Sequence, residues 1–404
     1  MRIGVNCYFM QPHVGGVRQY LINLLNQVLV HDTDNTYVLF CFEHNIRYLA
    51  EMGSDRWLAD AVHLTAMAQI RHHLRDVDVY FSPINGLQPT ALRPLPTVIM
   101  LPDAQEVYYP RYFTPADLFY RDWYYRVSSH LADQVITISH FSKQTIARHY
   151  RLSPDRIRVA YPCIDDRFNR ADTIARAPDY APPETFILYP ANRWRHKNHA
   201  ALLQAMQLIQ RQSGLRIHAV FTGVDESNGY DLLAEAVRAG LGGVVHKLGH
   251  VPVEQMVYLY RRARMLVFPS LFEGFGLPLV EAMATGCPIA ASKCTSLPEV
   301  AGEAALYFDP NSPEDIAATI QTLWFDEGLR ARLIEIGFRR ASMFSATQTM
   351  QAHLEAWKAT AETYSPQRYW RNRLLYLPIQ LLRVASKRTA GVYGRQGMST
   401  VDSN

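Results

Sequence analysis

The sequence predicts an α/β protein with two Rossmann-like domains, each built around a doubly wound parallel sheet. Apolar runs of strand length alternate with helix-length segments along most of the 404 residues. A stretch rich in proline and turn-forming residues divides this alternation into two halves. The length also suits two domains and is short for three.

The first domain is predicted to span residues 1–170, and it begins with a strand at 3–9 and a helix at 17–30. Further strands are expected at 37–42, 62–67, 77–82, 97–101, 135–139 and 157–161, with another helix at 116–131. Strands that alternate with helices form a parallel sheet with right-handed crossovers. Ligands of such sheets bind at the carboxyl ends of the strands.

A linker is predicted at 171–184, and the second domain at 185–343. Its strands are expected at 186–189, 216–221, 244–248, 265–268, 289–291 and 305–308. Its helices are expected at 198–212, 230–239, 253–262, around Glu281 and at 313–324. No G-x-G-x-x-G pattern follows the first of these strands, which argues against a dinucleotide redox cofactor.

The composition is that of an ordinary soluble protein, with 48% apolar and 19% charged residues. A net charge of +4 gives no reason to expect a nucleic-acid partner. The five cysteines are scattered and include no C-x-x-C pair, as in reduced proteins of the cytosol. The first apolar run is too short for a signal peptide, and no run has the roughly 18–20 apolar residues of a membrane span. We therefore expect a cytoplasmic protein.

The stretch 265–292 reads as a strand, a glycine loop, a helix and a strand. Gly274 and Gly276 let the loop backbone approach a ligand closely, and the loop amides and helix start form an anion site. Glu273 and Glu281 lie on either side of it. Carboxylates repel phosphate but accept hydrogen bonds from hydroxyls. The pattern favours a ligand with hydroxyls on both sides of a diphosphate, as in a nucleotide-sugar.

A basic loop follows the first strand of the second domain and contains Arg193, Arg195 and Lys197. Arg193 can bind phosphate oxygens with its planar fork, and Lys197 can act as a mobile point charge. The loop could therefore neutralise a departing diphosphate. The alternatives are a solvated basic turn here and, for the glycine loop, a buried strand–helix turn whose glutamates face solvent.

These features resemble the donor site of retaining glycosyltransferase family 4, which has the GT-B fold. The resemblance covers roughly residues 1–360 and is most specific at 186–310. It implies two domains that face each other across a cleft, and a helix at 344–364 that crosses back to the first domain. The motifs that carry it are Glu273-Gly-Phe-Gly-Leu-Pro-Leu-Val-Glu281, Pro190-Ala-Asn-Arg193-Trp-Arg-His-Lys197-Asn198-His, Gly249-His-Val-Pro and Ser296-Leu-Pro-Glu299-Val-Ala-Gly302.

The resemblance implies a metal-independent hexosyltransferase that moves a mannose- or glucose-type sugar from a nucleotide-diphosphate sugar, its co-substrate, with retention of configuration and with no other cofactor. The acceptor would be a saccharide or lipid-linked, in surface polysaccharide or glycolipid synthesis. The residues that the resemblance assigns to catalysis are Glu273, Arg193, Lys197 and Asp103. Those that it assigns to the donor are Gly15, Gly16, Asn192, Arg193, Lys197, Gly223, Glu273, Gly274, Phe275, Gly276, Leu277 and Glu281.

In this interpretation Arg193 and Lys197 stabilise the leaving diphosphate together with the amides of the glycine loop and the helix start. Glu273 holds sugar hydroxyls near the reacting carbon, and Glu281 holds the ribose. No side chain stands out as a nucleophile. The resemblance therefore favours attack on the face from which the diphosphate departs, with the leaving phosphate helping to take the acceptor proton.

Several positions of the first domain leave alternatives open. Gly15 and Gly16 form either a tight turn or a loop that approaches the donor phosphates or the acceptor. Pro102 stands where many relatives have a histidine near the reacting sugar, so that hydrogen-bonding role is absent or moved. Asp103 is either a base or orienting carboxylate for an acceptor hydroxyl, or a cap for the next turn. Ser139 is expected to cap the next helix, and lining the cleft is its alternative.

No metal site is predicted. Asp76 and Asp78 read as a solvated turn into a strand rather than as a metal-binding Asp-x-Asp pair. His72 and His73 lie on a predicted helix without an acidic third ligand.

The tail, residues 365–404, is basic, because no acidic residue lies between Glu362 and Asp402. Its mixture of arginine, lysine, aromatic and leucine residues can lie on an anionic membrane surface. We place that contact at 368–390, which would make the protein peripheral at the inner face of the membrane. A terminal helix packed on the domain or a partly disordered tail is the alternative.

Other functions stay open at this stage. A nucleotide-sugar epimerase or a phosphorylase could share the fold, and Pro102 also allows a noncatalytic nucleotide-sugar-binding partner. A structural subunit with a vestigial donor site is disfavoured, since the cationic and acidic residues of the donor motif are all present. The sequence does not identify the sugar, the base or the acceptor.

Overall fold

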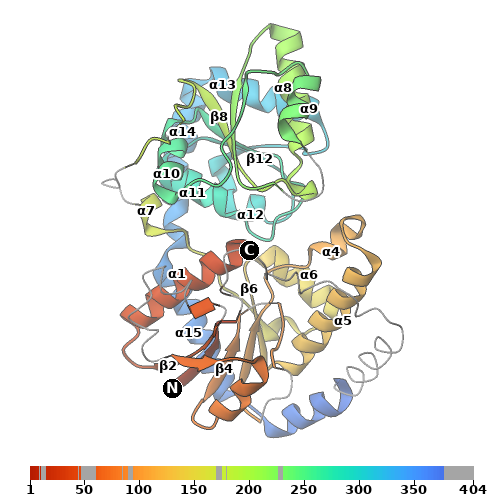
Figure 1. Ribbon diagram of the computed structural model, residues 1–404, viewed down its shortest axis with the longest axis vertical. Coiled ribbons are helices and arrows are strands. Elements are labelled where there is room, and N and C mark those ends of the chain that lie inside the picture. The colour runs from red at the N-terminus through yellow and green to blue at the C-terminus, as the bar shows by residue number, and fades with distance from the viewer. Residues whose placement is uncertain are drawn as a thin grey trace, which may run out of the picture.

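The computed structural model describes residues 1–8, 10, 15–43, 45–46, 61–83, 85–89, 94–169, 175–178, 180–225 and 231–376. These residues form two lobes, each with one parallel sheet surrounded by helices (Figure 1). The predicted α/β fold class is confirmed.

Within the described residues, the first sheet has seven parallel strands in the order β3-β2-β1-β4-β5-β6-β7. The strands are β1 (Arg2–Asn6), β2 (Thr36–Phe42), β3 (Val62–Leu64), β4 (Val79–Ser82), β5 (Thr97–Met100), β6 (Gln134–Thr137) and β7 (Ile157–Val159). The helical elements of this lobe include α1 (Gly15–His31), the 3-10 helix η1 (Met67–His73), α4 (Gln105–Tyr108), the 3-10 helix η2 (Pro110–Tyr112), α5 (Pro115–Leu131) and α6 (His140–Tyr150). The strand predicted at 62–67 therefore ends early, and η1 takes its last residue.

The second sheet has six parallel strands in the described part of the chain, in the order β10-β9-β8-β11-β12-β13. The strands are β8 (Phe186–Pro190), β9 (His218–Thr222), β10 (Val245–Lys247), β11 (Met265–Phe268), β12 (Ile289–Ser292) and β13 (Ala305–Phe308). The helices beside them include α8 (His199–Ser213), α9 (Leu232–Arg238), α10 (Val253–Arg262), α11 (Leu277–Thr285), α12 (Leu297–Ala301), α13 (Pro313–Phe325) and α14 (Glu327–Ala341).

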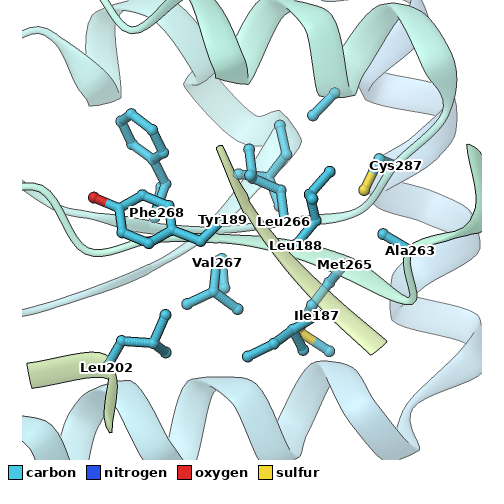
Figure 2. Close-up of a cluster of buried hydrophobic side chains, with 14 of the residues drawn as sticks. Ile187, Leu188, Tyr189, Leu202, Ala263, Met265, Leu266, Val267, Phe268 and Cys287 are labelled. Carbon is cyan, nitrogen blue, oxygen red and sulfur yellow. The ribbon is translucent and has the colours of Figure 1, made fainter. Parts of the chain in front are cut away.

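The centre of the second sheet is excluded from solvent on both faces. Ile187 and Leu188 of β8 and Leu266 and Val267 of β11 are fully buried, and Figure 2 shows them together with Leu202 of α8. Continuous apolar runs produce such strands when helices cover both faces of a parallel sheet. Because β8 and β11 end at the two loops that carry the predicted donor site, these loops start from a densely packed base.

The predicted crossover helix is α15 (Ala346–Glu362), which packs on the first sheet although it follows the second domain in sequence. Trp357 is fully buried there. Its ring centroid lies 5.4 Å from that of Phe81 in β4 and 6.2 Å from that of Tyr37 in β2. The expected return of the chain to the first domain is confirmed.

Helix α14 is not predicted from the sequence. Gly328 and Gly337 interrupt its pattern and lower its helix propensity. Gly337 faces α11, where a Cβ atom would lie 3.4 Å from Met283 Cγ, an ordinary van der Waals distance.

Two residues of the predicted first domain pack against the second sheet. Ile164 and Phe168 precede the predicted linker at 171–184, yet both pack in the core of the second sheet. The short helix α7 (Asp166–Asn169) contacts α10 and α11. The predicted domain boundaries remain predictions.

Glu299 of α12 ties the second domain to the first. Its carboxylate accepts hydrogen bonds from the backbone amides of His140, at 2.7 Å, and Phe141, at 2.9 Å, which start helix α6. The Tyr161 hydroxyl also donates to it, at 2.9 Å. A carboxylate is favourable at a helix start because it satisfies free amides and interacts with the helix dipole.

The start of α6 has a second cap within its own domain. The Ser139 hydroxyl accepts a hydrogen bond from the Ser142 amide at 3.0 Å, so the predicted capping role is confirmed. Ser139 is fully buried. The Ser142 hydroxyl donates to the Gly274 carbonyl at 3.4 Å and so links α6 to the glycine loop of the other domain.

Candidate active site

A cleft of about 1050 Å³ lies between the carboxyl edges of the two sheets. The strand order reverses between β1 and β4 in one sheet and between β8 and β11 in the other, and ligands of open sheets bind at such points. The first domain contributes Asp103 and the segment 111–114, among others. The second domain contributes residues 194–197 after β8 and 272–278 after β11. The cleft thus brings together the two loops that the sequence singles out.

Lys197 and Glu273 form an ion pair in this cleft. Lys197 Nζ lies 2.6 Å from Glu273 Oε1, and the two side chains are only 14% and 12% exposed. The backbones of the two loops are also joined, because the Leu271 amide donates to the His196 carbonyl at 2.7 Å. Each charge of the pair therefore has the other as its partner, in surroundings that screen charge poorly.

Side-chain hydrogen bonds from Ser296 and Asn198 fix both loops. The Ser296 hydroxyl forms hydrogen bonds with the carbonyls of Glu273, at 2.9 Å, and Phe275, at 3.0 Å. On the other loop, the Asn198 side-chain amide donates to the carbonyls of Pro269, at 3.1 Å, and Pro310, at 2.8 Å. The loop backbones are held by side chains that do not line the cleft.

Gly276 ends the glycine loop and caps α11 from the left-handed region, with φ +106°. Residues with a side chain are strained at this φ, and a Cβ atom there would lie 2.7 Å from Leu297 Cδ2, which would have to shift. Pro278 occupies the first turn, as predicted. No side chain in the described part of the chain caps this helix start, which leaves its amide groups and the positive end of the helix dipole toward the cleft.

Asp103 meets the glycine loop from the other domain. A Cβ atom on Gly274 would lie 2.6 Å from Asp103 Oδ2 and 2.9 Å from its Cβ. Asp103 Oδ1 accepts a hydrogen bond from the Gln105 amide at 3.2 Å. Burial raises the pKa of Asp103 to about 6, and the negative charge of Glu106 contributes. The carboxylate thus caps the local turn and also lines the cleft, and its catalytic role remains a prediction.

Arg193 does not line the cleft. Its side chain is 2% exposed and turns to the loop after β9, where its guanidinium is bonded to the Gly223 carbonyl and paired with Asp225. Asn192 joins the same contact, because its side-chain oxygen accepts from the Val224 amide at 3.0 Å. The structure separates Arg193, Asn192 and Gly223 from the residues at the cleft, and their predicted donor contacts remain untested.

Glu281 lies farther along α11, four residues after Leu277, on the same side of the helix. It is not among the residues that line the cleft. The Tyr260 hydroxyl donates to its Oε2 at 2.7 Å. Burial raises the pKa of Glu281 to about 7, against the opposing effect of this hydrogen bond. Its predicted contact with the ribose remains a prediction.

Gly15 and Gly16 form the first two residues of α1, which follows the carboxyl end of β1. The preceding loop, 11–14, lies outside the described residues. The structure places the two glycines in a helix start rather than in a free turn, and their contact with a ligand is not tested.

Sequence reasoning missed most of the first-domain wall of the cleft. Arg111, Tyr112, Phe113 and Arg121 line it, and they come from η2, α5 and the turn between them. The adjacent basic and aromatic residues at 111–113 are a signal that could have pointed to a ligand surface. His196 lines the opposite wall, where burial, with help from Lys197, lowers its pKa to about 3, so that the imidazole is neutral at physiological pH.

Among the residues that the structure describes, no group of three or more histidine, cysteine and acidic side chains could hold a metal ion. Asp78 accepts a hydrogen bond from the Arg2 amide at 2.7 Å, at the start of the sheet and away from the carboxyl edge. His72 and His73 lie in η1. Metal independence remains a prediction.

Two family models match adjacent parts of the chain. The model described as Glycosyltransferase Family 4 matches residues 14–168, and the model described as Glycosyl transferases group 1 matches residues 172–340. Together they take in the strands β2 to β13 and both walls of the cleft. The chain belongs to glycosyltransferase family 4.

Several curated relatives are mannosyltransferases by name. The family 4 chain is 35% identical over 238 residues to O-antigen chain mannosyltransferase B of Escherichia coli, over 55% of the chain and 60% of that protein. It is 29% identical over 231 residues to serotype-specific mannosyltransferase WbdA of Escherichia coli, over 55% of the chain and 28% of that protein. The matches thus span 60% or less of the length of these relatives.

A solved structure confirms the GT-B arrangement. Anabaena Alr3699/HepE, in complex with UDP and glucose, superposes with a TM-score of 0.68 over 89% of this family 4 chain and 100% of that chain. The sequence identity is 18%, so this likeness shows the fold.

Gly274→Ala tests the contact between the domains. Because the new Cβ would collide with Asp103, we expect a loss of about 1–3 kcal/mol in stability and a larger radius of gyration. Thermal unfolding and small-angle scattering measure these effects, with Gly328→Ala in α14 as the control. The double variant Gly274→Ala/Asp103→Gly should recover most of the loss. Strictly additive effects of the two substitutions would show that the contact does not limit the approach of the domains.

Asp103→Asn tests the burial of the carboxylate. An aspartate in an unfolded chain titrates near about 3.9, whereas this one titrates at about 6 in the folded protein. Ionisation of Asp103 therefore lowers the free energy of unfolding. This loss grows as the pH rises from about 3.9 to about 6 and reaches its full size above pH 6. We expect Asp103→Asn to raise the melting temperature at pH 8 and to change it little at pH 4. The exposed Asp155→Asn is the control, and an equal gain at both pH values would contradict the assignment.

Proposed function

We propose that this family 4 protein is a retaining hexosyltransferase that transfers mannose from a nucleotide-diphosphate sugar to a saccharide or lipid-linked acceptor. The observation that carries the proposal is the wall formed by Lys197, Glu273 and the start of α11, which faces Asp103 across the cleft. This wall combines positive and dipolar groups suited to a diphosphate with a carboxylate suited to sugar hydroxyls.

We assign the diphosphate to Lys197, Arg195 and the amides at the start of α11. Arg195 lines the cleft, is exposed, and has no carboxylate partner among the described residues. Arg193 was the sequence-based candidate, but its guanidinium is held by Gly223 and Asp225. In this proposal Arg193 is a positioning residue, which fixes the loop that presents the other two cations.

The two glutamates take different parts of the donor. Glu273 lies beside Lys197 at the cleft, where its carboxylate can accept hydrogen bonds from hydroxyls of the transferred sugar. Glu281 lies about one turn inside α11, the helix that follows the loop of Glu273, and this position suits the ribose of the nucleotide. The donor would then extend from the cleft along α11.

The proposed reaction needs no covalent intermediate with the protein. The bond between the anomeric carbon and the diphosphate oxygen breaks, and the acceptor oxygen bonds to the same face of that carbon. The acceptor proton passes to the departing phosphate oxygen. Lys197, Arg195 and the helix dipole stabilise the charge that develops on the diphosphate. Asp103 orients the acceptor hydroxyl.

The choice of mannose and of a polysaccharide acceptor is supported by the names of two relatives, an O-antigen chain mannosyltransferase and a serotype-specific mannosyltransferase. The neighbour with bound UDP and glucose supports a uridine nucleotide as the second candidate. A GDP-linked and a UDP-linked donor are therefore the two to compare.

A donor panel on wild type and Lys197→Met tests the proposal. A ligand in excess over its dissociation constant stabilises the folded state by mass action. We expect GDP-mannose to raise the melting temperature by about 2–4 °C, UDP-glucose and UDP-N-acetylglucosamine to raise it less, and the shift to vanish in Lys197→Met. The exposed Lys358→Met on α15 is the control. Thermal unfolding with each donor measures the shift.

Transfer of labelled mannose to octyl α-mannoside, with the anomeric configuration of the product read by NMR, completes the test. No shift with any donor would contradict the donor site. A shift without transfer would favour a noncatalytic nucleotide-sugar-binding partner. A requirement for phosphate would indicate a phosphorylase, and product formation without any acceptor would indicate an epimerase.

We also propose that the helix at 366–376 rests on an anionic membrane surface. One side of it is docked on the first domain, where the Asn372 amide donates to the His130 carbonyl at 2.8 Å and the Tyr376 ring stacks on His130 at 4.4 Å. The opposite side exposes Trp370 by 56% and Leu374 by 74%. Exposed apolar side chains in a segment rich in arginine and lysine suit the surface of a membrane that contains anionic lipids.

No helix in the described ranges is long and apolar enough to cross a bilayer. A surface contact in the proposed position depends on the exposed apolar side chains of the helix at 366–376, which are Trp370, Leu374 and Leu375 and would leave water on binding. The predicted contact at 368–390 extends beyond residue 376, and this further part lies outside the described residues.

Vesicle sedimentation tests the surface contact. With vesicles of phosphatidylcholine and phosphatidylglycerol, the double variant Trp370→Ala/Leu374→Ala should bind at least about tenfold more weakly than wild type, because two large apolar side chains lose their burial. Phe325→Ala, at an exposed aromatic of the second domain, is the control. Equal binding of wild type and double variant would contradict the proposal, and so would equal binding to vesicles of phosphatidylcholine alone.

A further inference from the structure

Two arginines of the first domain line the cleft opposite the donor wall, and both stack on aromatic rings. The guanidinium carbon of Arg111 lies 5.3 Å from the ring centroid of Tyr112. That of Arg121 lies 4.6 Å from the ring centroid of Phe113. All four residues line the cleft. A guanidinium that lies on a ring is held in one orientation, and its N–H groups point outward from the edge of its plane.

Arg111 is exposed, and within the described part of the chain it has no carboxylate partner. The ring of Tyr112 stacks in parallel on that of Tyr109, with centroids 5.2 Å apart. The guanidinium carbon of Arg111 also lies 5.6 Å from the ring centroid of Tyr109. Tyr109 is anchored to the second domain, since its hydroxyl donates to the Leu271 carbonyl at 3.1 Å. A cation is thus fixed at the cleft with no counter-charge from the residues that the structure describes.

Arg121 has a weak partner. Its nearest carboxylate atom is Oε2 of Glu106, at 3.8 Å, beyond hydrogen-bond distance. Glu106 is buried, and its other oxygen accepts from the Tyr150 hydroxyl at 2.9 Å. The guanidinium therefore keeps N–H groups free for a ligand, while Glu106 holds it near the cleft.

Arg126 provides the comparison. It also stacks on a ring, that of Tyr150 at 5.4 Å, and it comes from the same helix as Arg121. Its guanidinium, however, donates to Asp122 at 2.6 Å and to the His149 carbonyl at 3.1 Å, and it does not line the cleft. An arginine that only supports the structure has its donors occupied in this way, whereas those of Arg111 are open.

We propose that Arg111 and Arg121 form a binding site for a phosphate group carried by the acceptor. Paired planar guanidinium groups bind phosphate oxygens through bidentate hydrogen bonds. The residues assigned above to the donor diphosphate all belong to the second domain, so this site serves the other substrate. The inference rests on the proposed function and makes it more specific: the acceptor is a saccharide joined to its carrier through phosphate, and the aromatic rings beside the arginines contact its sugar.

Calorimetric binding with the donor site saturated by GDP tests the inference. The probes are octyl α-mannoside, which is neutral, its phosphodiester analogue mannosyl octyl phosphate, and octyl glucuronide, which carries a carboxylate. We expect wild type to bind the phosphodiester at least about tenfold more tightly than the neutral probe and more tightly than the glucuronide. Arg111→Gln should remove most of this preference and leave the affinity for octyl α-mannoside unchanged.

Three further variants sharpen the result. Arg111→Lys keeps the positive charge but loses the planar guanidinium that can form two hydrogen bonds with a phosphate. It should therefore retain only part of the preference for the phosphodiester over the neutral probe. Arg121→Gln should reduce the preference, provided that its melting temperature shows a folded protein. Arg126→Gln should leave the preference at the wild-type value. Higher salt should weaken the binding of the phosphodiester and not that of the neutral probe.

Equal affinity of wild type for the neutral and phosphodiester probes, or no binding of the phosphodiester, would overturn the inference. It would also be overturned if Arg111→Gln weakened the binding of GDP itself, because the arginine would then belong to the donor site. If the glucuronide bound more tightly than the phosphodiester, the inference would also be contradicted, because the arginines would then recognise a sugar carboxylate rather than a phosphate. Failure of the proposed function is separate, since it appears as absence of transfer from GDP-mannose to octyl α-mannoside.

Discussion

The site depends on how closely the carboxyl edges of the two sheets approach each other, and Asp103 meets the glycine loop at this interface. A Cβ atom on Gly274 would lie 2.6 Å from Asp103 Oδ2, so the interface as it stands has room for a glycine there. Glu299 fixes the same interface at another point by holding the start of α6. Because both contacts involve the loops or helix starts that surround the cleft, the width of the cleft and the positions of its polar groups are determined together.

Several residues hold the site in place without lining the cleft. Ser296 and Asn198 bind loop carbonyls, and Arg193 joins two loops through Gly223 and Asp225. Each of them forms hydrogen bonds with polar groups of the loops. A polar group that is buried without a partner lowers stability by about 1–3 kcal/mol. The same contacts hold Lys197 and Glu273 within 2.6 Å of each other. The surrounding hydrogen bonds therefore fix the positions of the charged side chains at the cleft.

The sequence was sufficient for the fold and for the second-domain wall, since glycines, a helix start and charged residues directly follow recognisable buried strands there. It was insufficient for Arg193, because residues of one loop point in different directions and its partner Asp225 comes from the loop after another strand. Arg111 and Arg121 follow no strand, so only the folded chain brings them to the cleft. Helix α14 (Glu327–Ala341) was not predicted, because Gly328 and Gly337 lower the helix propensity of its sequence.

The ion pair of Lys197 with Glu273 has a consequence for turnover. With the proposed donor, the diphosphate attracts Lys197 while the sugar hydroxyls compensate Glu273, so both charges keep partners when they exchange each other for the ligand. After transfer the sugar is gone, and Glu273 faces a diphosphate without hydroxyls in between. Repulsion between these negative groups favours return of Lys197 to Glu273. Glu273 would then compete with the product diphosphate for Lys197 and speed the dissociation of the spent nucleotide. An intact donor would stay bound longer than the product.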